Sequence, residues 1–467
     1  MGQHEESRRE TERAGSVPSD GPLDLFLTGE ELYRRGDWVG ARRAFHRVLA
    51  AQPGHFWGQF FLAICQLKCH EWEAARADLN ACLSQHPNFI WAYLFRSFAN
   101  EKLFEADAAH ADLDNAMELD SNDCARHALF LTRGVFHFEE GDLDLASADF
   151  RSAMRLKPDQ HHAYFNLAHV YLAQGKYQAA AEQVDIALRF HPPARAVFGY
   201  HAELGRRLLR DARYEDAVRE CETALKLTPG LALPLAVRGR ALLALGRHEQ
   251  AERSFDEYLA NGGQPLPDVF RARGQARMGL AKYPDAAEDY TRALESFPDG
   301  ELYQHRAWAH FFSDALKLAL RDFTKAIDLK PEAGDAYTGR GLTRVMLGDV
   351  PGAVADAEAA LSRHPTTPEM MHNVACIFAQ AAGRADAGPG SNHSELAEGY
   401  LRRAVELVRR TLEMLRAEDR PSFWRDKILT DPALTPIRDD LEFKRLQPVA
   451  GGILSLAGDQ LPPRIRP

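Results

Sequence analysis

An alanine recurs about every 34 residues over most of this 467-residue chain, and this period constrains the fold more than any other feature. A fixed period of about 20 to 50 residues is the signature of a repeat architecture. The chain is therefore expected to fold as an array of similar units that pack on their neighbours. The repeated alanines are Ala41, Ala75, Ala109, Ala146, Ala180, Ala217, Ala251, Ala286, Ala319 and Ala353.

Two further positions recur with the alanine, a small residue about twelve residues before it and, in most units, a proline about twelve after it. The small residue lies in a segment with apolar positions at helical spacing, and a turn such as Gly141-Asp142 precedes the alanine. Proline cannot continue the second helix. Each unit is therefore predicted to be helix, turn, helix, with a close helix approach at the small residue. The small residues are Gly29, Ala63, Ser97, Gly134, Ala168, Gly205, Gly239, Gly274, Ala307 and Gly341.

This pattern of Gly or Ala, aromatic, Ala and Pro resembles the tetratricopeptide repeat (TPR) family of helical hairpins with a 34-residue period. The resemblance covers ten consecutive units over residues 22–367 and an eleventh, interrupted unit over 368–415. It implies an all-α, right-handed superhelical solenoid of ten or eleven hairpins, whose first helices line a concave surface that holds a partner.

The rest of the chain is divided by composition. Residues 1–21 are expected to form a disordered tail and 448–467 a loose tail, and the Gly-, Ala- and polar-rich segment 383–393 a flexible insertion in the eleventh unit. Residues 416–447 carry spaced apolar side chains, as a helical cap over the last repeat requires. Those side chains are Trp424, Ile428, Leu434, Ile437, Leu441 and Phe443.

Arginine precedes the small residue in six units, and aspartate follows sixteen positions later in five of those six. A charge buried between helices is costly unless a carboxylate pairs with it, so we expect a structural ladder of ion pairs that fixes hairpin register. Binding of an acidic ligand is the alternative, and the pairing stays open between the same and the preceding hairpin. The predicted pairs are Arg96 with Asp112, Arg133 with Asp149, Arg273 with Asp289, Arg306 with Asp322, and Arg340 with Asp356, while Arg238 meets Ser254.

Aromatic residues concentrate at the predicted inner positions of the first three units. Aromatic side chains dominate binding hot spots, so these positions predict a groove for an apolar peptide. The alternatives are ordinary helix packing, cover by the N-terminal tail, and self-association with a second chain. The candidates are Phe26, Trp57, Phe60, Phe61, Trp91, Phe95 and Phe98.

A second candidate surface is basic. Arg206, Arg210, Arg240 and Arg271 fall at inner positions of three successive units, where they could contact an acidic partner. The Lys and Asn clamp with which family members grip chaperone C-termini is not visible, because the corresponding places are mostly apolar. The resemblance therefore disfavours binding of chaperone tails.

Catalytic and cofactor motifs are missing from the sequence. No phosphate-binding loop, nucleophile elbow or zinc-protease helix occurs. Cys65, Cys69 and His70 have the wrong spacing for haem attachment and fit helix packing better. His161, His162 and His169 lack a completing carboxylate or thiol. We predict no catalytic residue, no metal and no cofactor, and hence a non-enzymatic protein.

Composition bounds the partner and the compartment. The net charge of −10 argues against a generic nucleic-acid or anionic-membrane binder. Sparse cysteines and the lack of a recognisable signal peptide or apolar span predict reduced thiols in the cytoplasm.

The segment from Asp431 to Phe443 (DPALTPIRDDLEF), together with the Arg-Gly pairs of the repeats, is similar to repeat regions C-terminal to the catalytic domain of planctomycete-type bacterial serine/threonine kinases. No kinase motif is present. The expected function is a protein- or peptide-binding scaffold or adaptor. The alternative is a partner-recruiting subunit or fragment of a kinase signalling system.

Overall fold

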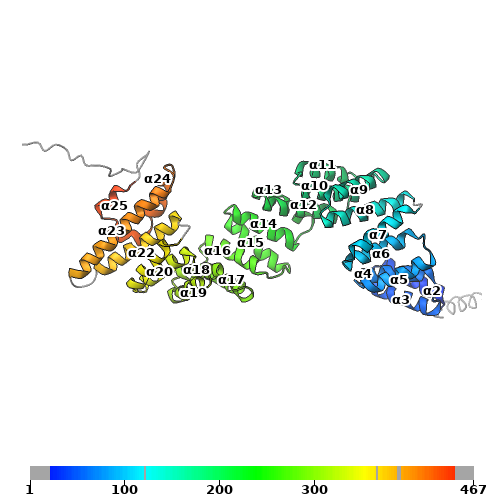
Figure 1. Ribbon diagram of the computed structural model, residues 1–467, viewed down its shortest axis with the longest axis horizontal. Helices are drawn as coiled ribbons and strands as arrows, with labels where there is room; N and C mark the ends of the chain where they lie inside the picture. Colours follow the sequence, from blue (N-terminus) through cyan, green and yellow to red (C-terminus); the bar gives the residue numbers. More distant parts are fainter. Residues whose placement is uncertain (1–20, 120–121, 364–366, 387–390, 448–467) are drawn as a thin grey trace, which may run out of the picture. The chain divides into compact units, whose positions relative to one another are not determined.

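The computed structural model describes residues 21–119, 122–363, 367–386 and 391–447, and within these ranges the chain contains helices and no strand. Consecutive helices pair into hairpins, as Figure 1 shows. The all-α repeat fold is thereby confirmed. The chain divides into two compact units, one ending at Tyr200 and one beginning at His201. The predicted tails fall almost wholly outside the described residues.

The first unit holds five hairpins, numbered 1 to 5 from the N-terminus. The helices of hairpins 1 to 3 are α2 (Pro22–Arg34), α3 (Trp38–Ala51), α4 (Phe56–Lys68), α5 (Trp72–Gln85), α6 (Ile90–Lys102) and α7 (Ala106–Glu118). Those of hairpins 4 and 5 are α8 (Asp123–Glu140), α9 (Leu143–Leu156), α10 (His161–Ala173) and α11 (Tyr177–Leu188). Helix α12 (Ala194–Arg210) contains the boundary between the units.

The second unit begins within α12, which is the first helix of hairpin 6. Hairpin 6 ends with α13 (Tyr214–Leu227), and hairpins 7 to 10 comprise α14 (Ala232–Ala244), α15 (His248–Ala260), α16 (Pro267–Gly279), α17 (Tyr283–Ser296), α18 (Gly300–Phe312), α19 (Leu316–Leu329), α20 (Gly334–Met346) and α21 (Val350–Leu361). Hairpin 11 is α22 (Pro368–Asp386) and α23 (Ser391–Met414).

The small residue of each hairpin is where its two helices meet. A Cβ on Gly29 would lie 2.7 Å from the ring of Phe45, sixteen residues later on the second helix. Gly134 has the same relation to Phe150, also at 2.7 Å. A real Cβ contact is not this short, so the ring occupies the space that a missing side chain leaves. The repeated alanines are also buried, all ten at 1% exposure or less.

The turn between the two helices has a left-handed residue at the same place in each of hairpins 1 to 10. The residue five positions before the repeated alanine has a positive φ in every case. Glycine adopts this left-handed conformation without steric cost, whereas other residues pay about 1 kcal/mol or more. Five hairpins use Gly36, Gly141, Gly175, Gly246 and Gly348 there, and five use His70, Phe104, Ala212, Ala281 and Asp314.

Hairpin 11 corrects the predicted insertion. Helix α22 continues to Asp386 and α23 begins at Ser391, so both helices extend into residues 383–393. The Arg-Ala-rich start of that segment favours continued helix, and sequence periodicity alone does not locate where α22 ends. Its remaining residues, 387–390, lie outside the described part.

The cap is more irregular than the predicted helical segment. It consists of α24 (Arg420–Phe423), a π-helical turn (Trp424–Ile428), a 3₁₀ helix (Pro432–Ile437) and α25 (Leu441–Arg445). Its predicted apolar residues join the core that covers hairpins 10 and 11, with one exception. Leu441 is 71% exposed because it begins α25 on the solvent side, so its place in the cap core was predicted wrongly. Among the described helices, none is long and apolar enough to cross a membrane.

Candidate functional site

The aromatic residues predicted for the groove form a network of ring contacts in which several members are core. The ring centres of Phe26 and Phe61 each lie 5.7 Å from the ring centre of buried Phe45. Phe60 is 6% exposed, with its ring 5.0 Å from Phe89 of the next hairpin. Adjacent helix residues point about 100° apart, so Phe61 packs toward hairpin 1 and Phe60 toward hairpin 3. The placement of Phe60 on an open groove is therefore corrected.

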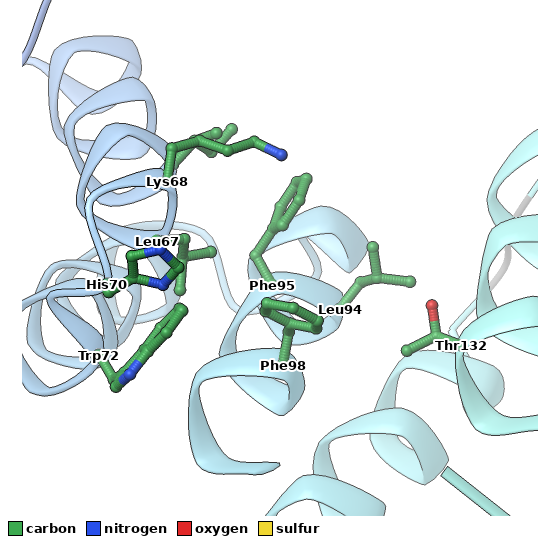
Figure 2. Close-up of a pocket in the computed structure, with 9 residues that line it drawn as sticks. Leu67, Lys68, His70, Trp72, Leu94, Phe95, Phe98 and Thr132 are labelled. Carbon is green, nitrogen blue, oxygen red and sulfur yellow. The ribbon is translucent and has the colours of Figure 1, made fainter. Parts of the chain in front are cut away.

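A pocket of about 390 Å³ lies between the first helices of hairpins 2, 3 and 4 (Figure 2). We call it the aromatic pocket. Its ring system is open to solvent on one side, because Phe98 remains 39% exposed. The ring of Trp72 meets that of Phe98 edge-on at 6.3 Å. The lining residues are Ile64, Leu67, Lys68, His70, Trp72, Leu94, Phe95, Phe98 and Thr132.

His70 holds one side of this pocket in a strained conformation. It is one of the non-glycine residues at the left-handed turn position, with φ at +62°. Its ring lies 5.1 Å from Trp72, and Figure 2 shows both side chains facing Phe95 and Phe98 across the pocket. The same left-handed turn recurs in every hairpin from 1 to 10, so this conformation belongs to the repeat, and the contribution of His70 to this pocket is its ring.

Trp57 and Trp91 lie outside the aromatic pocket. Trp57 is 50% exposed and lines a neighbouring, more open pocket of about 560 Å³ with Phe56 and Phe89. Trp91 is half-buried, with its ring 6.5 Å from that of Phe95. The predicted aromatic surface is therefore divided between core contacts and two hollows.

The predicted basic surface is partly neutralised by its own helices. Arg206 donates two hydrogen bonds of 2.7 Å to Glu203, one turn earlier on α12. Arg271 donates to Asp268 at 2.9 Å. Arg210 and Arg240 are exposed. A paired guanidinium has less to offer an acidic ligand, so these four residues make a weaker candidate site than the aromatic pocket.

The arginine ladder pairs within hairpins. Arg133 donates from Nε and Nη2 to Asp149, each at 2.9 Å. Arg96, Arg273, Arg306 and Arg340 make the same two-pronged contact with the aspartate sixteen residues later. Arg238, which meets serine at that place, donates to Ser254 at 3.0 Å and to Glu257 at 2.6 Å.

Most ladder arginines also reach the preceding hairpin. Arg96 donates to Asn80 at 2.7 Å, Arg273 to Asp256 at 2.7 Å, and Arg306 to Thr291 at 3.0 Å. Arg133 lies 3.5 Å from Asp114. Each of these guanidinium groups therefore bridges two successive second helices. The sequence left open whether the pairing is within a hairpin or with the preceding one, and these arginines do both.

Burial and pairing together set the charge of the ladder. Hydrogen bonds to Asp149 raise the pKa of Arg133 against the opposing effect of burial. Burial likewise opposes the charge of Arg273, but its hydrogen bonds to Asp289 and Asp256 outweigh it and raise its pKa. These arginines stay charged and their donors are used, as expected for a structural rather than a ligand-binding role.

Of the thiols and histidines considered in the sequence, Cys65 lies in the core and His70 lines the aromatic pocket. Cys65 is buried, and burial, with a smaller contribution from Cys69, raises its pKa to about 12. Such a thiol is unreactive at neutral pH. The rings of His161 and His162 stack at 4.0 Å on α10.

Sequence reasoning missed several walls of the aromatic pocket, namely Lys68, Trp72 and Thr132. The period itself holds a signal for Trp72, which is the first residue of a second helix and follows the turn directly. Thr132 carries no such signal. It comes from hairpin 4, a full repeat away, and only the packing of α8 brings it to the pocket.

Two models described as tetratricopeptide repeat match the chain. One matches residues 32–95 and 137–203, and the other matches 202–265 and 306–368. Together these ranges cover more than half of the chain.

Curated relatives include the Hsp70-Hsp90 organizing protein of Triticum aestivum, 25% identical over 245 residues, or 52% of this chain and 42% of that protein. The Hsp70-Hsp90 organizing protein 2 of Arabidopsis thaliana is 23% identical over 322 residues, or 65% of this chain and 50% of that protein. The chain thus spans half or less of the length of these relatives.

Among solved structures, the C-terminal part of a TPR repeat-containing protein from Cytophaga hutchinsonii is similar with a TM-score of 0.43. It is 19% identical and covers 52% of this chain and 98% of its own.

Proposed function

Because this chain belongs to the tetratricopeptide repeat family, we propose that it is a protein-binding adaptor that holds an unfolded segment of its partner against the first helices of hairpins 2 to 4. The aromatic pocket is the observation that carries this proposal. It combines a defined volume, an apolar lining from hairpins 2 and 3 with Thr132 from hairpin 4, and a partly exposed phenylalanine.

The side chains that line the pocket indicate which residue of a partner would bind in it. Leu67, Leu94 and Phe95 offer apolar contacts, and Trp72 and Phe98 offer ring edges and faces. Pockets of this size with mostly apolar walls bind best to a large aliphatic or aromatic group that becomes fully desolvated. The partner segment is therefore expected to place a leucine, phenylalanine or tryptophan side chain here.

The positive charge of Lys68 indicates which residues of the partner would flank that apolar side chain. Lys68 is exposed and lines the pocket next to His70. A cation at the edge of an apolar pocket favours a carboxylate there and adds specificity and association rate more than affinity. The proposed ligand is an apolar anchor with an acidic residue beside it.

A peptide-display experiment tests this proposal. Random peptides are selected on the full-length chain, and the winners are measured by fluorescence anisotropy against Phe98→Ala. We expect enrichment of an apolar anchor with acidic neighbours, and a roughly tenfold or larger loss of affinity in the variant. Lys68→Glu should weaken the acidic peptides selectively.

Phe104→Ala is the matched control, because Phe104 is a nearby phenylalanine that is 96% exposed and does not line the pocket. Equal binding by the intact chain and Phe98→Ala, with helical circular dichroism unchanged, would refute the pocket as the binding site. So would enrichment of peptides without any apolar anchor.

A further inference from the structure

Three metal-ligating side chains meet where the cap packs on α22. His372 and Cys376 are four residues apart on this helix and so share a face, and Asp431 comes from the cap, 55 residues beyond Cys376. His372 Nε2 lies 2.8 Å from Asp431 Oδ2 and 3.6 Å from Cys376 Sγ. Cys376 Sγ lies 3.3 Å from the same carboxylate oxygen.

These separations can be compared with those around a tetrahedral ion. Zinc binds nitrogen and oxygen at about 2.0 to 2.2 Å and thiolate sulfur at about 2.3 Å, which at tetrahedral angles puts sulfur about 3.5 Å from each neighbour and nitrogen about 3.3 Å from oxygen. The two separations that involve Cys376 Sγ agree with this to within about 0.3 Å. The separation between nitrogen and oxygen is about 0.5 Å shorter, so a small rotation of either side chain would open it.

Two of the three residues are buried, and Asp431 is partly exposed. His372 is 8% and Cys376 2% exposed, and both lie beside Val374, Ile377 and other members of the core beneath the cap. Asp431 Oδ1 accepts a hydrogen bond from the backbone of Ala433 at 2.9 Å, which leaves Oδ2 for the cluster. A polar group in such a place is costly unless it is paired or binds an ion.

The histidine has a free nitrogen on its other side. Within the described residues, His372 Nδ1 is buried without a hydrogen-bond partner. A hydrogen bond to Asp431 and an ion at Nε2 both leave this Nδ1 unpaired, so the second ring nitrogen does not distinguish the two arrangements. A pair of His372 and Asp431 alone does not require Cys376 one helical turn away on the same face, or its sulfur against the same Oδ2. An ion bound by all three residues requires both.

We propose that His372, Cys376 and Asp431 bind one zinc-like divalent ion, with water as the fourth ligand, and that the ion joins the cap to α22. Imidazole, thiolate and carboxylate are the ligand types of zinc sites, and three protein ligands leave one position open. Binding deprotonates the thiol and releases that proton to solvent. The thiolate and the carboxylate then balance the charge of the ion.

Cobalt titration tests the site. The full-length chain, reduced and stripped of metal, is titrated with Co²⁺ alone while absorbance is recorded. We expect a sulfur-to-cobalt charge-transfer band and tetrahedral visible bands that saturate at one ion per chain, both abolished by Zn²⁺. The melting temperature of the second unit should rise when the ion is bound.

Two variants and one control assign the ligands. Cys376→Ala should abolish the charge-transfer band, and Asp431→Asn, which keeps an oxygen for Ala433, should weaken binding at least tenfold. The double variant Cys65→Ala, Cys69→Ala removes two thiols of α4 and its C-cap and should leave the band unchanged. If Cys376→Ala fails to fold, Asp431→Asn decides.

The proposal is overturned if the folded chain gives no charge-transfer band. It is also overturned if the band survives in Cys376→Ala or disappears in the double variant. Binding of unchanged affinity in Asp431→Asn would likewise exclude the carboxylate as a ligand, and the three residues would then form only a hydrogen-bonded contact between α22 and the cap.

Discussion

Hairpins 1 to 3 and hairpins 7 to 10 build the same helical pair with different chemistry between the helices. In the early hairpins, rings contact one another from one hairpin to the next, Phe26 with Phe61 and Phe60 with Phe95. In the later hairpins, Arg273 and Arg306 span the same kind of junction with hydrogen bonds to carboxylates and a hydroxyl. The backbone template is shared, but ring contacts are concentrated at the junctions of the early hairpins, where Arg96 is the one ladder arginine among the described residues, and charged contacts predominate at the later ones.

This difference indicates where a partner can bind. A buried ion pair stabilises a register only when its donors and acceptors are all used, and such a surface offers a ligand little. Rings have no such limit, because an exposed aromatic face gains free energy whenever another apolar group covers it. The aromatic end is therefore the part of the array with binding capacity left over.

The largest expected effect comes from removing one carboxylate of the ladder. Asp289 is fully buried and accepts hydrogen bonds from Arg273 and Arg277. Asp289→Ala leaves two guanidinium groups partly unpaired and should lower the free energy of unfolding of the second unit by about 3 kcal/mol. Native-state hydrogen exchange of α16 and α17 measures it.

The matched control for this change is in the aromatic end. Asp78 has the same place in hairpin 2, where leucine replaces the arginine and Gln59 donates to it at 3.3 Å. Asp78→Ala should cost about 1 kcal/mol or less. Equal losses at Asp78 and Asp289 would contradict the distinction between the two regions.

The second prediction concerns the close approach of the two helices at the small residue, a feature found in both compact units. A Cβ on Gly134 or Gly239 would lie 2.7 or 2.8 Å from the ring of Phe150 or Phe255. Gly134→Val and Gly239→Val should each destabilise their own unit by about 1 to 3 kcal/mol, because the ring must move. Thermal unfolding measures both. Tolerance in one unit alone would show that the close approach is not a common requirement.

The third prediction uses pH to isolate a charge in the second unit. Burial raises the pKa of Glu252, but hydrogen bonds from Lys282 and Arg277 outweigh this, and the net pKa is lowered. The carboxylate therefore contributes stability that is complete above its unfolded pKa of about 4.5 and is lost as pH falls through the lower folded pKa.

Glu252→Gln should cost about 1 to 2 kcal/mol at pH 7, and the difference from the unaltered chain should shrink below pH 4.5. Urea unfolding at several pH values measures it. Glu249→Gln is the control, because its pair with Arg253 is exposed on both sides and should change stability by only a few tenths of a kcal/mol. A pH-independent cost at Glu252 would exclude a role for its charge.

The smallest expected effect is a gain in stability in the aromatic end. Phe104 is exposed and has φ at +61°, a conformation that Gly141 adopts in the next hairpin without strain. Phe104→Gly should therefore stabilise the first unit by up to about 1 kcal/mol. Chemical denaturation measures the change. Destabilisation would mean that the exposed ring makes contacts which outweigh its backbone strain.

Much of the fold was predictable because each hairpin repeats a few positions with a clear physical role. The alanines, the small residues and the turn fix two helices per unit, and the spacing of Arg96 and Asp112 already indicated which side chains could meet across them. The end of α22 was not predictable, because an Ala-rich segment without a clear stop can continue a helix or leave it.

The site was predictable only in part. Exposure depends on which hairpin a ring faces, so neighbours such as Phe60 and Phe61 could not be assigned from their type. Thr132 and Asp431 reach their clusters from distant segments, and nothing in the sequence links either residue to the cluster that it joins. The resemblance to kinase-linked repeats, the cytoplasmic location, the non-enzymatic role and self-association stay predictions.

The arginines that bridge successive hairpins repeat one arrangement from hairpin to hairpin. Arg273 uses an acceptor on its own second helix and one on the helix before it, and Arg306 repeats the arrangement one hairpin later. If hairpin 8 were excised whole, Arg306 would keep Asp322 and would arrive beside Asp256, the acceptor on the preceding hairpin that Arg273 had used. Duplication or loss of a complete hairpin therefore keeps this arginine bridge and gives this half of the chain a route to change in length, whereas Glu252 would need new partners in place of Arg277 and Lys282.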